Sequence, residues 1–271
     1  MALMLAKAFV RGKHDPKEYM ASEKYDGYRA YWNGRCLSTR GGHIINAPDW
    51  FVKLLPTKDR VGLDGELWMG RGNYQLCSHL RRREPDNAKW IKTKFMVFDN
   101  MDKEKVEKRH LDVARAVSRI RSRFSKMKLS RGMPKQCPIH TVKQTHVRSS
   151  KHLNAMFSAI IRKGGEGLML IRKGSVYEHG RTRKGNLLKL KKNSDAECEV
   201  IGYKKNSIGQ LKSFICKDLK HPKSKFLLAG FPHSVSRSFA TTHKVGTKIT
   251  YIYNGRTDSG LPRHARYFRK K

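Results

Sequence analysis

Acidic residues are scarce in this chain. Its 271 residues include 22 Asp and Glu against 59 Lys and Arg, and the formal net charge is +37. Solubility needs only a small net charge, so a merely soluble surface does not account for this excess. A polyanionic partner does, because clustered Lys and Arg release the counterions of a nucleic acid when they bind it. Membrane association is an alternative, but no basic amphipathic helix stands out as an anchor, and we expect no membrane contact.

Cysteine pairs and long apolar runs are also lacking. The five cysteines are scattered without a CxxC pair, which argues against a zinc site and predicts reduced thiols in an intracellular compartment. No apolar run reaches the ~20 residues of a membrane-spanning helix. The short apolar stretch 1–10 carries no cleavage signal, so we expect no signal peptide. The remaining composition is that of a globular protein with a sizeable core.

The pattern of apolar residues predicts an α+β fold. Short apolar runs separated by Gly and Asn indicate strands, and Asn33-Gly34 indicates a two-residue hairpin turn. Apolar residues at helical spacing predict an amphipathic helix over residues 103–125. A second helix is predicted to be capped by Ser149 or Ser150 and to stop at two glycines.

The composition changes slightly near Lys192, beyond which the pattern predicts short strands and no helix. About four or five such strands are typical of a small Greek-key barrel of the OB type. We therefore predict two domains, residues 1–192 and residues 193–271, of which the second is a small all-β OB-fold barrel.

The stretch 24–29, Lys-Tyr-Asp-Gly-Tyr-Arg, places an amine, a carboxylate, a flexible glycine and a guanidinium close together. These groups suit attack on a nucleotide α-phosphate, with Lys24 as the nucleophile and Asp26 and Arg29 beside it. An ammonium must lose its proton before it attacks, and partial burial and the cations Arg29, Lys189 and Lys191 would favour that loss. Taken alone, Lys24 is more simply a solvated surface lysine, and Asp-Gly a turn.

Three later segments carry side chains of compatible chemistry. Arg40 follows a strand and precedes two glycines, where a bidentate guanidinium suits a phosphate, with a plain loop arginine as an equal alternative. Glu66 lies on the apolar strand 63–67, where a carboxylate is costly unless it binds a ribose hydroxyl, a metal, or a nearby Lys or Arg. Phe98 either stacks on a purine or belongs to the core.

Glu166 and two lysines complete the series. Alone, Glu166 is a solvated acid at the start of a strand, but together with Glu66 it offers two carboxylates for a divalent cation that bridges phosphates. Lys189 and Lys191 lie on one face of a strand because side chains alternate along it. Neighbouring lysines repel each other, so a polyphosphate between them explains their placement better than a solvated basic strand.

In this order, the segments resemble the nucleotidyltransferase motifs of ATP-dependent DNA ligases, and especially of the minimal bacterial and phage-type enzymes. The resemblance covers nearly the whole chain. It implies an ATP-grasp-like nucleotidyltransferase domain of antiparallel sheets with helices, followed by the OB-fold barrel. Further similarity lies in the segments 22–24, 31–34, 46–51, 63–72, 177–181 and 195–202.

The resemblance also implies roles for single residues. Lys24 would take AMP from ATP as a phosphoramidate, Glu66 would bind the ribose, and Phe98 would stack on adenine. Glu66 and Glu166 would hold Mg²⁺, for which Mn²⁺ can substitute, while Lys189 and Lys191 would contact the α-phosphate. The residues expected to bind the nucleotide are Glu23, Lys24, Arg29, Arg40, Glu66, Phe98, Glu166, Lys189 and Lys191.

The partner implied by the resemblance is nicked double-stranded DNA, bound by a monomer. Arg40 would contact the 5′-phosphate at the nick, and Arg263 would contact DNA or pyrophosphate. Larger ligases carry an extra N-terminal DNA-binding domain, which we expect the excess basic charge to replace here. A basic loop is the first candidate for further DNA contact, with a solvated loop as the alternative; it comprises Arg81, Arg82 and Arg83.

Two other classes of protein remain alternatives. One is another covalent nucleotidyltransferase, either an RNA ligase or a GTP-using capping enzyme; the segment 46–51 and the compact barrel favour a DNA ligase over both. The other is a non-catalytic nucleic-acid-binding protein that kept the fold. The presence of Lys24, both glutamates and both strand lysines argues against it. The sequence therefore predicts an enzyme that seals 5′-phosphate/3′-hydroxyl nicks.

Overall fold

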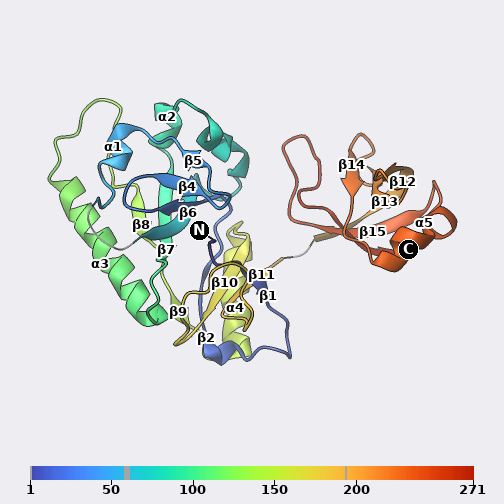
Figure 1. Ribbon diagram of the computed structural model, residues 1–271, viewed down its shortest axis with the longest axis horizontal. Helices are drawn as coiled ribbons and strands as arrows, with labels where there is room; N and C mark the ends of the chain where they lie inside the picture. The colour runs from blue at the N-terminus through green and yellow to red at the C-terminus, as the bar shows by residue number, and fades with distance from the viewer. Residues whose placement is uncertain (1, 58–61, 193) are drawn as a thin grey trace. The chain divides into compact units, whose positions relative to one another are not determined.

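The computed structural model describes residues 2–57, 62–192 and 194–271. The chain divides into two compact units, residues 1–191 and residues 192–271, which are described in turn (Figure 1). No helix among the described residues is both long and apolar enough to cross a membrane.

One sheet of the first unit has five strands in the order β1-β11-β10-β2-β9. β10 pairs antiparallel with β2 and β11, and β1 pairs parallel with β11. The strands are β1 (Lys7–Ala8), β2 (Tyr19–Glu23), β9 (Thr145–His146), β10 (Gly167–Arg172) and β11 (Leu187–Lys191).

Helix α4 (Ser150–Arg162) packs on this sheet, where its Leu153 joins Leu168 and Leu170 in a buried cluster. The hydroxyl of Ser149 caps the helix by accepting a hydrogen bond from the His152 amide at 3.0 Å. The predicted second helix and its cap are confirmed.

The other sheet of the first unit has six strands in the order β5-β4-β3-β6-β7-β8. Its central strands β3, β6 and β7 are antiparallel, and β8 pairs parallel with β7. The strands are β3 (Tyr28–Trp32), β4 (Leu37–Thr39), β5 (Ile44–Ile45), β6 (Leu63–Trp68), β7 (Lys94–Asp99) and β8 (Ile139–Thr141). Short helical segments lie between its strands: α1 (Asp49–Val52), η2 (Tyr74–Arg81) and α2 (Asn87–Trp90). A further one, η1 (Pro16–Glu18), lies between β1 and β2 of the five-stranded sheet.

The long helix α3 (Val106–Ser125) lies against β7 and β8. Its buried residues Val113, Val117 and Ile120 recur at intervals of three and four, which places them on one face of the helix. The predicted amphipathic helix is confirmed, although it begins at Val106 rather than at residue 103.

The hairpin between β3 and β4 turns one residue later than predicted. Trp32 pairs with Leu37, so that Gly34 and Arg35 form the turn, with Gly34 at a φ of 93°. Asn33 flanks the turn instead, and its side-chain oxygen accepts hydrogen bonds from the amides of Arg35 and Cys36. The prediction of a turn at Asn33-Gly34 was wrong in position because Gly adopts the positive φ that the turn requires more readily than Asn.

The second unit contains one sheet in the order β14-β13-β12-β15-β16. A parallel bridge joins Ala229, next to β14, with Arg266 of β16, so the sheet closes on itself. The backbone amide of Tyr267 donates to the Ala229 carbonyl at 2.9 Å across this closure. The strands are β12 (Ser194–Lys205), β13 (Leu211–Asp218), β14 (Lys225–Leu228), β15 (Lys248–Tyr253) and β16 (Arg266–Lys270).

The prediction that this part of the chain is all-β was wrong. Helix α5 (His233–Thr242) lies between β14 and β15. Val235 and Phe239, four residues apart, pack its inner face against the strand residue Phe214. The helix escapes detection because it is short and its Ser, Thr and His residues have low helix propensity.

Candidate active site

Lys24 lies directly after β2, where that strand leaves the five-stranded sheet. Its backbone amide donates to the Gly167 carbonyl at 2.9 Å, which ties it to the start of β10. Its side-chain nitrogen donates to Oε2 of Glu166 at 2.5 Å, and 22% of the side chain is exposed. The structure thus brings together the predicted nucleophile and a predicted metal ligand that are far apart in the sequence.

Glu166 joins two lysines from neighbouring strands. Its Oε2 pairs with Lys24, and its Oε1 pairs with Lys191 at the end of β11. We expected cations to surround Lys24, but the group that contacts its nitrogen is a carboxylate. The physical reason is the register of β10 and β11, which pairs Gly167 with Lys191 and so brings Glu166 beside both lysines.

Lys189 lies on the same strand as Lys191, two residues before it. Its backbone is paired on both sides, with Met169 of β10 and with Ala8 of β1. The alternation predicted for the two lysines follows from β11 being a regular strand over Leu187–Lys191.

Glu66 faces this group from the six-stranded sheet. Its Oε1 accepts a hydrogen bond from the Gly27 amide at 3.1 Å. Burial raises the pKa of Glu66 to about 7, although the charges of Lys24 and Arg29 oppose that rise. Only glycine fits at position 27, since an added Cβ would lie 2.2 Å from the Leu67 carbonyl oxygen of β6.

Arg29 is held by a set of contacts that the sequence did not predict. Its Nε and one terminal nitrogen donate to the two oxygens of Asp64 at 2.9 and 2.6 Å, and its other terminal nitrogen donates to the Met4 carbonyl at 2.6 Å. The Tyr177 hydroxyl donates to Asp64 at 2.9 Å and accepts from the Met4 amide at 2.9 Å. Burial by itself would lower the pKa of Arg29, but the charge of Asp64 outweighs it, so that the pKa of Arg29 is raised.

The Asp64–Arg29 pair has a signal in the sequence. Asp64 precedes Glu66 by two residues on β6, so both carboxylates lie on one face of that strand. Strand β3 pairs Arg29 with Glu66 and Tyr31 with Asp64, which makes Arg29 a diagonal neighbour of Asp64. Tyr177 carries no comparable local signal, because its contact with Asp64 spans 113 positions of the chain.

Glu23, expected among the nucleotide-binding residues, is bound by Arg71. The guanidinium of Arg71 donates to both oxygens of Glu23 at 2.8 and 2.7 Å. Arg71 follows β6 between Gly70 and Gly72, so this bidentate pair ties the turn after β6 to the end of β2, directly before Lys24. Arg71 was not among the predicted site residues, since an arginine between two glycines looks like an ordinary loop residue.

Phe98 is only partly buried on β7, whereas its neighbours Phe95 and Val97 belong to the core. The Arg29 guanidinium lies over its ring, 5.4 Å from the centroid. Asp26 occupies the turn between β2 and β3 and is partly exposed, and Arg40 is exposed in the turn between β4 and β5.

The three arginines predicted as one loop differ in structure. Arg81 ends η2, with its guanidinium 5.8 Å from the centre of the Tyr28 ring. Arg82 and Arg83 follow in the loop, and Arg82 pairs with Asp86 at 3.5 Å. Arg263 belongs to the second unit, where its backbone amide donates to the Gly255 carbonyl at 3.0 Å.

The sequence model of a protein family, the ATP-dependent DNA ligase domain, matches residues 3–191, which is most of the chain. The chain belongs to the ATP-dependent DNA ligase family.

Known DNA ligases are similar to this chain over nearly its whole length. A DNA ligase of Haemophilus influenzae is 30% identical over 255 residues, which cover 93% of this chain and 87% of that protein. A solved structure described in a structure–function analysis of Lig E DNA ligases has a TM-score of 0.83 and 29% identity, covering 100% of this chain and 99% of that one. The Chlorella virus DNA ligase-adenylate shares the fold, with a TM-score of 0.58 and 18% identity over 100% of this chain and 99% of that one.

The ligase is an enzyme that uses ATP and acts on DNA. Its structure has the mixed α+β nucleotidyltransferase-like fold of the Lig E ligases, with several sheets and few helices. The motif residues Lys24, Glu66 and Glu166 lie together in its first unit.

A divalent metal fits the carboxylates of this site. No group of three or more His, Cys, Asp and Glu ligands occurs in the described ranges. Glu66 and Glu166 are close enough for the charge of Glu166 to raise the pKa of Glu66. Magnesium typically keeps several waters and is held by one or two carboxylates together with substrate phosphates, so this pair is a suitable donor set.

Replacing Glu66 by glutamine is expected to stabilise the ligase near pH 8 and to reduce its activity. The unfolded carboxyl ionises near a pKa of about 4.3, whereas that of the folded site has a pKa of about 7. The wild type therefore loses stability as the pH rises through this window, because the unfolded state loses its proton first. The amide carries no charge and still accepts from Gly27, so Glu66→Gln should gain about 0.5–2 kcal/mol near pH 8 and little near pH 4.

Denaturant unfolding of the wild type and Glu66→Gln at both pH values measures this difference. Self-adenylylation should fall at least about tenfold in the variant, because one carboxylate in the site is lost. An equal effect on unfolding at both pH values would show that ionisation of Glu66 is not the cause.

Proposed function

We propose that this ligase seals nicks in duplex DNA through an adenylate carried on Lys24. Nζ of Lys24 attacks the α-phosphorus of ATP, an N–P bond forms, and the bond to the β-phosphate oxygen breaks to release pyrophosphate. An oxygen of the 5′-phosphate at the nick then attacks the same phosphorus and breaks the N–P bond. Finally the 3′-hydroxyl attacks the 5′-phosphorus, closes the backbone and expels AMP.

The contact between Lys24 and Glu166 carries this assignment. Lys24 lies beside a carboxylate that also holds Lys191, which supports its proposed role as the nucleophile. We infer that the ammonium of Lys24 leaves Glu166 and loses its proton when the triphosphate enters. Lys189 and Lys191 then face the α-phosphate and balance its charge, as positioning and electrostatics dominate phosphoryl transfer.

Glu66 and Phe98 are proposed to hold the nucleoside of ATP. Glu66 would accept from a ribose hydroxyl, and the partly buried Phe98 would stack on adenine. Glu23 would act on the nucleotide site through the Arg71 pair rather than by direct contact. When bound, Mg²⁺ or Mn²⁺ would lie at Glu66 and Glu166 and neutralise charge on the phosphates.

Arg29 is proposed to act near phosphate from a preset position. Asp64 and the Met4 carbonyl occupy all three of its guanidinium nitrogens. Its orientation is therefore set before substrate binds, and its charge acts on the site at short range. Asp26 would lie beside the nucleophile in the same turn.

Residues 1–192 are proposed to form the adenylation domain and residues 193–271 a DNA-binding OB fold. The order of the five strands, the helix between the third and fourth strands and the parallel closure at Ala229 and Arg266 support this assignment. DNA would be held by exposed or partly exposed cations, and the enzyme would act as a monomer. The cations proposed to contact DNA are Arg40, Arg81, Arg82, Arg83 and Arg263.

Incubation of the purified ligase with α-labelled ATP and magnesium tests the proposal. The protein should acquire label and release it when unlabelled nicked duplex DNA is added, with sealed strands as the product. Duplexes with RNA or DNA on the 3′-hydroxyl side then define the substrate. Absence of a labelled protein, or a strong preference for all-RNA ends, would contradict this function.

Nick sealing is expected to fall steeply with salt, because DNA phosphates are bound by exposed Lys and Arg. At limiting enzyme the rate should fall at least about 100-fold between ~50 and ~200 mM monovalent salt. Self-adenylylation provides the control, since ATP is small and should be less sensitive. A flat profile for sealing would contradict electrostatic binding of the duplex.

A further inference from the structure

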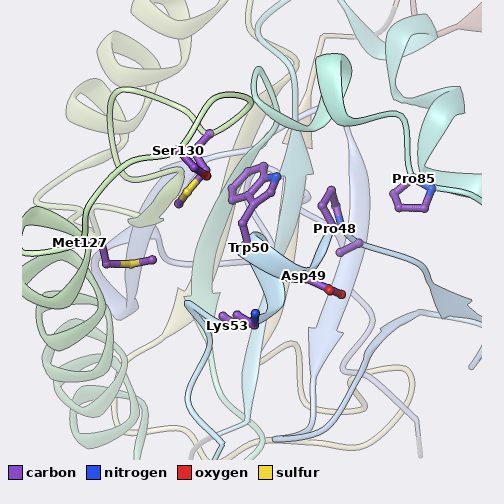
Figure 2. A pocket seen from close by; sticks show the side chains of 9 residues that line it. Pro48, Asp49, Trp50, Lys53, Pro85, Met127 and Ser130 are labelled. Carbon is purple, nitrogen blue, oxygen red and sulfur yellow. The ribbon is translucent and has the colours of Figure 1, made fainter.

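A pocket lies in the first unit, and none of the side chains placed in the active site lines it. Its volume is about 590 Å³. Figure 2 shows the Trp50 ring in this pocket, with Met127 and Ser130 on one side and Pro48 and Pro85 on the other. The nucleotidyl transfer reaction leaves this pocket without a role.

The lining of the pocket is mostly apolar, and hydrogen bonds fix the position of its Trp50 ring. The indole nitrogen of Trp50 donates to the side-chain oxygen of Asn87 at 2.6 Å, and the side-chain nitrogen of Asn87 donates to the Gly132 carbonyl at 3.0 Å. Asn87 therefore connects α1 to the segment that follows α3. With its N–H already bonded, Trp50 offers a ring face that needs no polar partner.

The charge beside the pocket is basic on the side formed after α3, whereas Glu84 and Asp86 flank Pro85 on the other side, where Asp86 pairs with Arg82 and Lys89. Residues 113–165 contain no Asp or Glu, and Met127, Ser130 and Met133 of the lining belong to this acid-free stretch. Exposed cations alternate with them along the chain, namely Lys126, Lys128 and Arg131. Lys53, directly after α1, adds a cation to the lining, which also contains the acidic Asp49.

We infer that this pocket docks an acidic segment of a partner protein, which inserts one bulky apolar side chain. The cations between residues 126 and 131 complement an acidic chain, and the Trp and Met side chains form an adaptable apolar surface. Duplex DNA fits the pocket less well, because its bases are stacked inside and it presents no protruding apolar group. The cations alone would serve a phosphate backbone, but the apolar lining would then gain nothing.

Two synthetic probes test the inference on the full chain. One is a fluorescein-labelled peptide of Asp, Glu and Ser with a single central phenylalanine, and the other has alanine in its place. Both carry the same charge, so the overall +37 of the protein attracts them equally. Burial of the phenyl ring should make the first bind about tenfold more tightly, as measured by fluorescence anisotropy.

Variants identify the binding site. Met127→Asp should remove the preference for the phenylalanine peptide. Arg131→Glu should weaken the binding of both peptides about fivefold at low salt. The matched control is Lys143→Glu, which makes the same charge change at an exposed position in the acid-free stretch, outside the pocket lining. It should leave the ratio between the peptides unchanged. Nick sealing by Met127→Asp should stay at the wild-type rate.

Two results would overturn the inference. Equal affinity for both peptides in the wild type would show that the pocket takes no apolar side chain. The second result concerns the binding of a labelled duplex. If Met127→Asp and Arg131→Glu weaken that binding more than Lys143→Glu does, while binding of the peptides is unaffected, this surface binds nucleic acid.

Discussion

Lys24→Ala is expected to abolish attachment of AMP to the ligase. Alanine offers no nitrogen to attack the α-phosphorus, and neither Lys189 nor Lys191 replaces it, because both project from β11, which β10 separates from the strand that precedes Lys24. Intact-protein mass spectrometry after incubation with ATP and magnesium should detect the added mass of one AMP in the wild type and none in the variant. We expect a loss of at least about a thousandfold in the rate of adenylylation.

Further substrates separate the loss of the nucleophile from general damage. Lys24→Ala should bind nicked duplex nearly as well as the wild type, since one cation among 59 Lys and Arg contributes little to the long-range field. It should also seal DNA that already carries the adenylate, because that step uses the 3′-hydroxyl as nucleophile. Lys24→Arg should be as inactive as the alanine variant, since a guanidinium stays protonated in proteins. Continued adenylylation of Lys24→Ala would mean that another residue is the nucleophile.

Asp64→Ala is expected to have the largest effect on stability. Asp64 is fully buried and accepts two hydrogen bonds from Arg29 and one from Tyr177. Its removal leaves a largely buried guanidinium without its counter-charge, which typically costs about 3–5 kcal/mol. The free energy of unfolding from denaturant titration should fall by this amount, and adenylylation should fall with it because Arg29 loses its fixed orientation.

An exposed ion pair provides the comparison. Glu18→Ala removes the partner of Arg172, at 3.0 Å, where both side chains are more than a third exposed. Such surface pairs contribute about 0–1 kcal/mol, so this variant should unfold nearly like the wild type. A loss below about 1 kcal/mol for Asp64→Ala would show that water reaches Arg29 and that the pair is not energetically buried.

Local patterns predicted much of the first unit. The helix that became α3 follows from Val113, Val117 and Ile120, whose spacing places them on one face. The start of α4 was predicted from the capping serines, and the hydroxyl of Ser149 accepts the capping hydrogen bond. Helix α5 was missed because its apolar residues are few, and its packing on Phe214 rather than its propensity stabilises it. The hairpin turn was placed one residue too early, since φ at Gly34 depends on the strand register.

The motifs predicted which residues belong to the candidate site but not which of them contact one another. The motifs named Lys24, Glu66, Glu166, Lys189 and Lys191, because each is a charged side chain placed within or next to an apolar strand. They gave no role in the site to Arg71 or Tyr177, whose partners lie far away along the chain, although both residues lie in segments of similarity.

The sequence by itself determined the chemistry available to this ligase: its charge, its ordered motifs and the residues proposed to attack or bind a phosphate. Only the tertiary structure decided which of these charges pair, joining Lys24 and Lys191 through Glu166 and holding Arg29 on Asp64. Residue types and their spacing are local properties, whereas a pairing depends on strand register and on which segments the folded core brings side by side.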